Sequence, residues 1–156
     1  MKIKVGIIGG SGYTGIELLR ILHQHPEAEV IAISSRALQG KKVAEVFPSM
    51  AGLSALIYSL PDDKRLNDCD IIFFATPHGV AMNGAGSFLE KDIKVIDLGA
   101  DFRIHDARTG LNGTTWSTPK IRYSKKQFMV NQKFEERPLK VLAWLQTLAV
   151  IQRQFC

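Results

Sequence analysis

The chain has 156 residues, of which 46% are hydrophobic and 22% charged, and its mean hydropathy is +0.01. This composition excludes a wholly disordered chain and predicts one globular domain. No apolar run approaches the roughly 20 residues of a membrane-spanning helix, and a strand pattern begins within the first five residues, so we expect no signal peptide. Two cysteines, Cys69 and Cys156, form no disulfide framework and suit the cytoplasm.

Charge and glycine are unevenly distributed along the chain. Residues 1–108 hold 12 Lys and Arg against 13 Asp and Glu, a net charge of −1, whereas residues 109–156 hold 8 against 2, a net charge of +6. Eleven of the 13 glycines lie in the first part. Such an asymmetry is typical of a basic nucleic-acid-binding tail, or of a segment with a different origin.

Strand and helix signals alternate over the first hundred residues. Four buried strands and one edge strand are predicted, at Lys2–Ile8, Ala28–Ile33, Asp70–Ala75 and Lys94–Asp97, with the edge strand at Ala55–Ser59. Helical spacing runs from Ile16 to the proline at Pro26, and again over Val80–Lys91, while Lys41–Phe47 is less regular. The alternation predicts an α/β fold, with a Rossmann-type parallel sheet covered by helices on both faces.

A glycine loop follows the first strand. Gly9, Gly12 and Gly15 form the pattern G-x-x-G-x-x-G between a strand and a helix. The first glycine permits the tight turn, the second lets the backbone approach a pyrophosphate, and the third lets the helix pack against the strand. The N–H groups at the start of the helix then face the phosphates. The loop predicts a dinucleotide site, and a glycine-rich turn without a ligand is the alternative.

The end of the second strand indicates which dinucleotide would bind. NAD-binding proteins usually place Asp or Glu there, to accept a hydrogen bond from the ribose. This chain has Ser34, Ser35 and Arg36 instead. Two hydroxyls and a guanidinium suit a 2′-phosphate, so NADP is favoured over NAD. The alternative is that Arg36 is a solvated surface charge.

Two residues are candidates for contact with a substrate. His78 follows the third buried strand, at the edge where open α/β sheets bind ligands, and a structural histidine is the alternative. Arg103 follows the fourth buried strand and could hold an anionic group, or pair with Asp101 or Asp106. No metal site is predicted.

Cys69 is a poor candidate for a nucleophile. It stands between Asp68 and Asp70, whose negative charges raise the pKa of a thiol. We expect it to be a small residue of the core or its boundary.

Four blocks of sequence resemble the N-acetyl-γ-glutamyl-phosphate reductase family of the semialdehyde dehydrogenase superfamily. They fall in the family's order within residues 1–107, and they are Val5–Arg20, Ser34–Arg36, Ala75–Ala81 (ATPHGVA) and Asp97–Arg103 (DLGADFR). The resemblance implies an NADP site, and substrate contacts from His78 and Arg103. The expected cofactor-binding residues are Gly9, Ser11, Gly12, Tyr13, Thr14, Gly15, Ser35, Arg36, Thr76 and Pro77.

The resemblance also implies a reaction. In this family a cysteine thiolate displaces phosphate from N-acetyl-γ-glutamyl phosphate, and NADPH reduces the resulting thioester to the semialdehyde. The family's cysteine lies in a Pro-Gly-Cys-Tyr-Pro-Thr motif, which does not occur in this chain as translated, and Cys156 does not match it. We therefore expect a cytoplasmic enzyme that is a homo-oligomer at full length, and no catalytic residue within these 156 residues.

The basic tail is compatible with translation in a shifted reading frame. Codons that straddle neighbouring residues of Leu145–Phe155 can encode A-N-P-G-C-Y-P-T-A-I. The same shift makes Lys126–Val130 compatible with A-V-Y-G, and lets Asn112–Thr114 begin W-Y. We therefore predict an NADP-binding part at residues 1–107 and an out-of-frame tail at residues 108–156, irregular or helical, with the substrate domain absent.

Two other functions are consistent with the sequence. One is a non-catalytic Rossmann protein whose basic tail binds nucleic acid, although the tail shows no recognisable binding module and we do not expect such a partner. The other is a cofactor-binding subunit that a partner chain completes.

Overall fold

The structure is a computed structural model that describes residues 2–52 and 54–99. The predicted tail, the domain boundary at residue 107 and Arg103 lie outside this range. The main elements are β1 (Ile3–Ile8), α1 (Tyr13–His23), β2 (Ala28–Ser34), α2 (Val43–Val46), β3 (Ile71–Phe74), α3 (Val80–Leu89) and β4 (Lys94–Asp97). Two short 3-10 helices, η1 (Pro48–Met50) and η2 (Lys64–Asp68), lie between α2 and β3.

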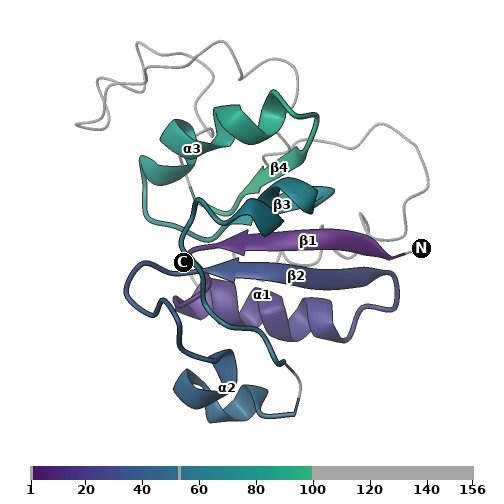
Figure 1. Ribbon diagram of the computed structural model, residues 1–156, viewed down its shortest axis with the longest axis vertical. Coiled ribbons are helices and arrows are strands. Elements are labelled where there is room, and N and C mark those ends of the chain that lie inside the picture. The colour runs from purple at the N-terminus through teal and green to yellow at the C-terminus, as the bar shows by residue number, and fades with distance from the viewer. Residues whose placement is uncertain (1, 53, 100–156) are drawn as a thin grey trace.

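The four strands form one parallel sheet in the order β2-β1-β3-β4 (Figure 1). Each strand is buried over most of its length, as expected for a sheet covered on both faces. The register between β1 and β2 shifts between Val5 and Gly6, whose partners are Val30 and Ala32, so β2 carries one extra residue there. The predicted parallel sheet and its four buried strands are confirmed.

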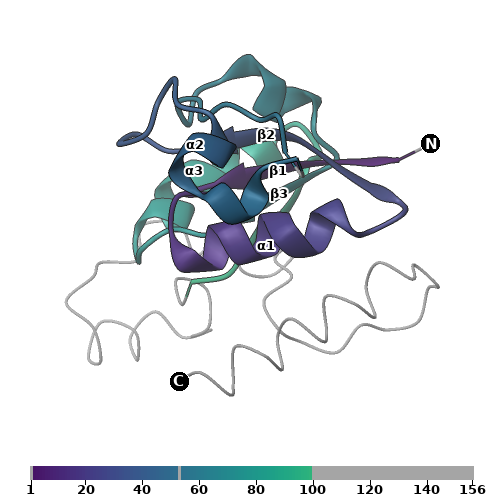
Figure 2. The ribbon, with the colours of Figure 1, turned by 90° about the horizontal axis from the view of Figure 1, so that it is seen from below.

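Alternate residues of the strands bury two separate cores. Leu18, Leu19 and Leu22 of α1 pack on one face of the sheet, against Ile7 and Ile33 among others. Figure 2 shows α1 running along that face. In the second core, apolar side chains of α3 and η2 pack on the other face of the sheet. This core includes Leu66, Ile72, Phe74, Met82, Ala85, Phe88 and Leu89. Helices therefore cover both faces, as predicted.

Two sequence predictions need correction. Helix α1 begins at Tyr13, within the glycine loop, and not at Ile16, because the Gly12 carbonyl already accepts a hydrogen bond from the Ile16 N–H. The predicted edge strand over Ala55–Ser59 is not a strand: it forms only isolated bridges, from Ser59 to Ser34 and from Ile57 to Lys42. Its backbone bonds largely to the loop after β2 and not along β2.

The segment before β3 crosses the face of the sheet opposite α1. Leu66 of η2 is buried beneath it, and a Cβ atom added at Gly6 of β1 would lie 2.9 Å from Leu66 Cδ2 and 3.0 Å from Cys69 Sγ. A glycine in β1 therefore makes room for this crossing. Asp63 caps η2, since its carboxylate accepts from the Arg65 backbone N–H at 2.9 Å and pairs with the Arg65 guanidinium at 2.7 Å.

The cap of η2 predicts a pH-dependent contribution to stability. The Arg65 guanidinium lowers the pKa of Asp63 from 3.8 to about 2. Because the folded-state pKa is depressed, the stabilisation is present above about pH 4 and is lost as the pH falls towards 2. We expect Asp63→Asn to lower the free energy of unfolding by roughly 1 kcal/mol at pH 6, since Arg65 is half exposed to solvent.

Urea unfolding of both proteins at pH 6 and pH 2.5 measures this difference. The difference in the free energy of unfolding between the two proteins should be smaller at pH 2.5 than at pH 6. A difference that stays constant would show that the ion pair is not its source.

Candidate functional site

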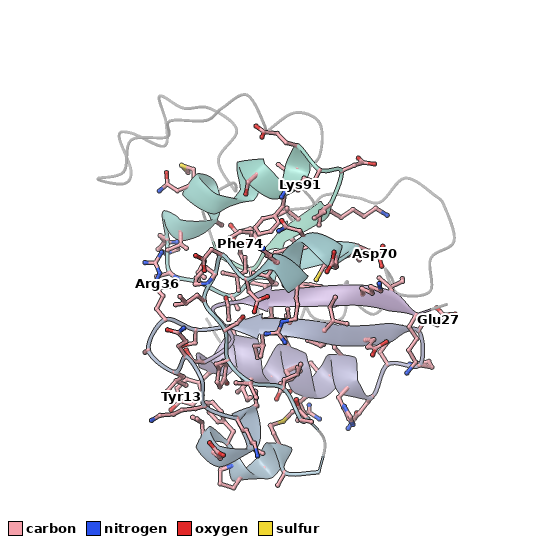
Figure 3. All side chains as sticks on the ribbon, in the orientation of Figure 1. Tyr13, Glu27, Arg36, Asp70, Phe74 and Lys91 are labelled. Carbon is pink, nitrogen blue, oxygen red and sulfur yellow. The ribbon has the colours of Figure 1, made fainter. Side chains whose placement is uncertain are left out.

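The carboxyl ends of all four strands meet at one edge of the sheet. The glycine loop follows β1, Ser35 and Arg36 follow β2, Thr76 follows β3, and Gly99 follows β4. Figure 3 shows Tyr13 and Arg36 at this edge, whereas Glu27 and Asp70 lie at the opposite one. Parallel α/β sheets bind their ligands at the carboxyl edge, so this is the candidate site.

The glycine loop is fixed to the end of β2 by two backbone hydrogen bonds. The N–H groups of Gly9 and Gly10 both donate to the Ser34 carbonyl, at 3.1 and 2.9 Å. Gly9 has a φ of +83°, which side-chain-bearing residues rarely adopt, and a Cβ atom there would lie 2.6 Å from the Ala75 carbonyl oxygen. The loop is therefore held between the ends of β2 and β3.

Gly15 brings the helix against the loop. A Cβ atom on Gly15 would lie 2.6 Å from Gly10 Cα and 2.8 Å from the Gly9 carbonyl oxygen. Gly12 is different, since a Cβ atom there would have only the Gly9 oxygen nearby, at 3.9 Å. Gly9 and Gly15 thus have the tight-turn and close-packing roles predicted from the sequence, and Gly12 faces open space.

The start of α1 presents unpaired N–H groups. Gly12 is the N-cap and supplies no side-chain cap, and the first turn contains no acidic residue. The amides of Tyr13, Thr14 and Gly15 have no hydrogen-bond partner among the described residues. Three free donors at the positive end of the helix dipole suit an anionic ligand. The Tyr13 side chain is 93% exposed beside them.

Two hydroxyls from different loops meet at the end of β2. Ser35 Oγ donates to Ser11 Oγ at 2.9 Å, and Ser35 is buried. Arg36, the next residue, is exposed. The described residues at this strand end include no carboxylate. Ser34, which the sequence analysis grouped with Ser35, is fully buried, and its Oγ has no hydrogen-bond partner among the described residues. The second hydroxyl beside Ser35 is therefore that of Ser11 and not that of Ser34.

The residues after β3 divide into two groups. Thr76 lies against the glycine loop, because its Cγ2 would be 2.7 Å from a Cβ atom on Gly9. Pro77 and His78 are exposed in the turn before α3, whose N-cap is Gly79 in a left-handed conformation. Thr76 therefore joins the site. Arg103 lies outside the described residues.

The sequence analysis did not select Tyr58 and Ser59 as site residues. Tyr58 Oη donates to the Gly10 carbonyl at 3.2 Å, and the Ser59 carbonyl accepts from the Ser35 N–H at 2.9 Å. No motif marks either residue. The only sequence signal was an aromatic residue inside a segment taken for an edge strand.

Cys69 has the character predicted for it. It is 5% exposed, and its thiol lies 3.4 Å from the Arg65 carbonyl. Burial raises the pKa of the Cys69 thiol to about 12, and the charges of Asp68 and Asp70 add to this shift. Residues 2–52 and 54–99 contain no cluster of possible metal ligands, and none of their helices is long and apolar enough to span a membrane.

Cys69 should therefore resist alkylation in the folded protein. With a pKa of about 12, only about one thiol in ten thousand is ionised at pH 8. In a Cys156→Ser background, we expect iodoacetamide to modify Cys69 at least about 100-fold more slowly in buffer than in 6 M urea. Mass spectrometry over time measures both rates. Equal rates would show that Cys69 is neither buried nor shifted in pKa.

A model of a known protein family matches this chain over most of its length. The model of the family described as "Semialdehyde dehydrogenase, NAD binding domain" matches residues 4–147. The chain belongs to this family. The match includes the whole glycine loop, β1 from Lys4 onward, and all of β2, β3 and β4.

Two similar curated relatives carry the same name. The chain is 61% identical over 107 residues to the N-acetyl-gamma-glutamyl-phosphate reductase of Ruthia magnifica subsp. Calyptogena magnifica, an alignment that covers 69% of this chain and 32% of that protein. It is 57% identical over 115 residues to the reductase of the same name from Vesicomyosocius okutanii subsp. Calyptogena okutanii, covering 74% and 32%. The chain thus spans about a third of the length of these relatives.

Solved structures agree on the fold. An aspartate semialdehyde dehydrogenase with NADP from Candida albicans superposes with a TM-score of 0.57 at 22% identity, over 69% of this chain and 32% of that one. The aspartate semialdehyde dehydrogenase II of Vibrio cholerae gives a TM-score of 0.55 at 21% identity, over 66% and 30%. These similarities support the dinucleotide-binding fold alone.

Proposed function

We propose that this chain is the NADP-binding part of an N-acetyl-γ-glutamyl-phosphate reductase. The observation that carries the proposal is the identity of 54–61% to reductases of that name, over 69–74% of this chain in its N-terminal part. The site residues support it independently, because their geometry suits a phosphorylated dinucleotide.

The described residues fit the pyrophosphate of such a cofactor. The free amides of Tyr13, Thr14 and Gly15 would donate to phosphate oxygens, and an anion there would be favoured by the dipole of α1. Side chains on Gly9 or Gly15 would collide with backbone atoms, so glycine keeps the loop close to the strand ends. The exposed Gly12 leaves room for a ligand to approach the backbone.

The end of β2 supports NADP over NAD. Ser11 and Ser35 place two hydroxyls side by side, and the exposed Arg36 can turn its planar fork of donors toward a 2′-phosphate. A carboxylate here would accept from a free ribose hydroxyl and repel a phosphate, and the strand end has none. We propose Ser35 and Arg36 as the residues that recognise the 2′-phosphate.

Arg36→Ala should weaken binding of the phosphorylated nucleotide selectively. Loss of one charge-assisted contact to phosphate should raise the Kd for 2′,5′-ADP about 10-fold. The Kd for 5′-AMP, which lacks the 2′-phosphate, should change less than about twofold. Isothermal titration of both ligands measures this.

The matched control is Lys64→Ala, which removes one exposed positive charge from η2. This short helix packs on the face of the sheet opposite α1. It should leave both affinities unchanged. Equal weakening of both ligands by Arg36→Ala, or no weakening of either, would refute recognition of the 2′-phosphate by Arg36.

For the complete protein we propose NADPH-dependent reduction of N-acetyl-γ-glutamyl phosphate to the semialdehyde, with release of phosphate, in the cytoplasm and as a homo-oligomer. His78 and Arg103 are proposed as residues that face the substrate. The proposal assigns no catalytic residue to the 156 residues of this chain. Steady-state assays of a full-length product, with this acyl phosphate and NADPH, test the activity directly.

We also propose that the reading frame shifts between the codons for Ala107 and Leu111. The change in charge and glycine content at this point supports it, as do the alignments with relatives, which extend over 104–115 residues. The family match itself runs on to residue 147. Resequencing the DNA across these codons decides the matter. We expect a missing or extra base, which would mean that the sequence of this chain contains an error, whereas an unchanged sequence would mean that the product with this tail is genuine.

A further inference from the structure

Tyr58 is the side chain that reaches the glycine loop from the segment between α2 and β3. It is 1% exposed, and its Oη donates to the Gly10 carbonyl at 3.2 Å. Its own backbone is fixed on both sides, since its N–H donates to the Lys41 carbonyl at 3.0 Å and its carbonyl accepts from the Gly40 N–H at 2.8 Å. A buried phenol so firmly held can define the orientation of the group it contacts.

That group is the peptide between Gly10 and Ser11. A peptide unit is planar, and its carbonyl and N–H point in opposite directions. A hydrogen bond that fixes the Gly10 carbonyl toward the core therefore turns the Ser11 N–H away from it. The Gly10 N–H is also held, by the Ser34 carbonyl at 2.9 Å. The peptides on both sides of Gly10 thus have a defined orientation before any ligand binds.

The same short segment holds the other half of the site. Ser59 follows Tyr58, its N–H donates to the Ile33 carbonyl at 3.0 Å, and its carbonyl accepts from the Ser35 N–H at 2.9 Å. Ser35 in turn donates to Ser11. Residues 58 and 59 therefore join the loop after β1 to the end of β2 and the loop after it, because the Ser59 bonds form the isolated bridge to Ser34.

The chemistry of Tyr58 suits a permanent donor. Burial raises the pKa of its phenol, so the hydroxyl remains protonated and able to donate throughout the physiological range. The Gly10 carbonyl has no other partner among the described residues.

We propose that Tyr58 is a positioning residue of the nucleotide site, which orients the Gly10–Ser11 peptide so that the Ser11 N–H faces the pyrophosphate of the cofactor. The inference rests on the proposed NADP site. It assigns Tyr58 no contact with the cofactor, because Tyr58 acts through the backbone of the loop.

The test compares Tyr58→Phe with the unaltered chain, using NADPH and adenosine 2′-monophosphate as probes. The variant keeps the ring in the core and removes only the donor. We expect the Kd for NADPH to rise about 5- to 30-fold, because the loop loses its preorganisation. The Kd for adenosine 2′-monophosphate, which has no 5′-phosphate for the loop to bind, should stay within about twofold. A merely structural role for Tyr58 would weaken both ligands together.

Ser54→Ala is the matched control from the same segment. It removes the hydrogen bond from the Leu56 N–H to Ser54 Oγ, which lies outside the site. Both affinities should be unchanged. An unaltered Kd for NADPH in Tyr58→Phe, or equal weakening of both ligands, would overturn the inference. If the unaltered chain does not bind NADPH, it is the proposed NADP site that fails.

A measurement on the unaltered chain keeps the inference testable should Tyr58→Phe not fold. In amide-resolved NMR, saturation with NADPH should shift the Ser11 N–H signal and slow its exchange with solvent. A Ser11 amide that neither shifts nor gains protection at saturation would overturn the proposal.

Discussion

The site depends on one contact, in which the Ser34 carbonyl at the end of β2 accepts hydrogen bonds from both Gly9 and Gly10. This contact turns the chain sharply at the end of β1, and the turn is possible because Gly9 can adopt a φ of +83°. Helix α1 then starts directly after Gly12, and Gly15 in its first turn packs on Gly10. The free amides of the first helical turn are thereby aimed at the edge where the strands end.

The sequence predicts most of this arrangement because its signals are local. Each buried strand is a short apolar run closed by glycine or by polar residues, and β4 coincides with the predicted range Lys94–Asp97. The glycine spacing predicts the loop because a side chain at each of these positions would hinder the turn, the approach of a ligand or the packing of the helix. In the structure, a Cβ atom added at Gly9 or at Gly15 would lie less than 3 Å from backbone atoms.

The rest could not be predicted because it depends on contacts distant in sequence. The segment over Ala55–Ser59 has the residues of a strand, yet its hydrogen bonds go largely to Gly40 and Lys41 in the loop after β2 and to Val43 at the start of α2. The role of Tyr58 needs a partner 48 residues away. Helix η2 is held by the single buried side chain of Leu66 in a polar stretch, and one apolar residue gives no periodicity to detect.

The central claim is that the carboxyl edge of this sheet binds NADPH. The most direct measurement is an amide-resolved NMR titration of the isotopically labelled chain with NADPH. Saturable shifts are predicted at residues 9–15 and 34–36, with NADH producing weaker saturation. Absence of saturable binding, or shifts confined to the amino edge near Glu27 and Asp70, would contradict the account.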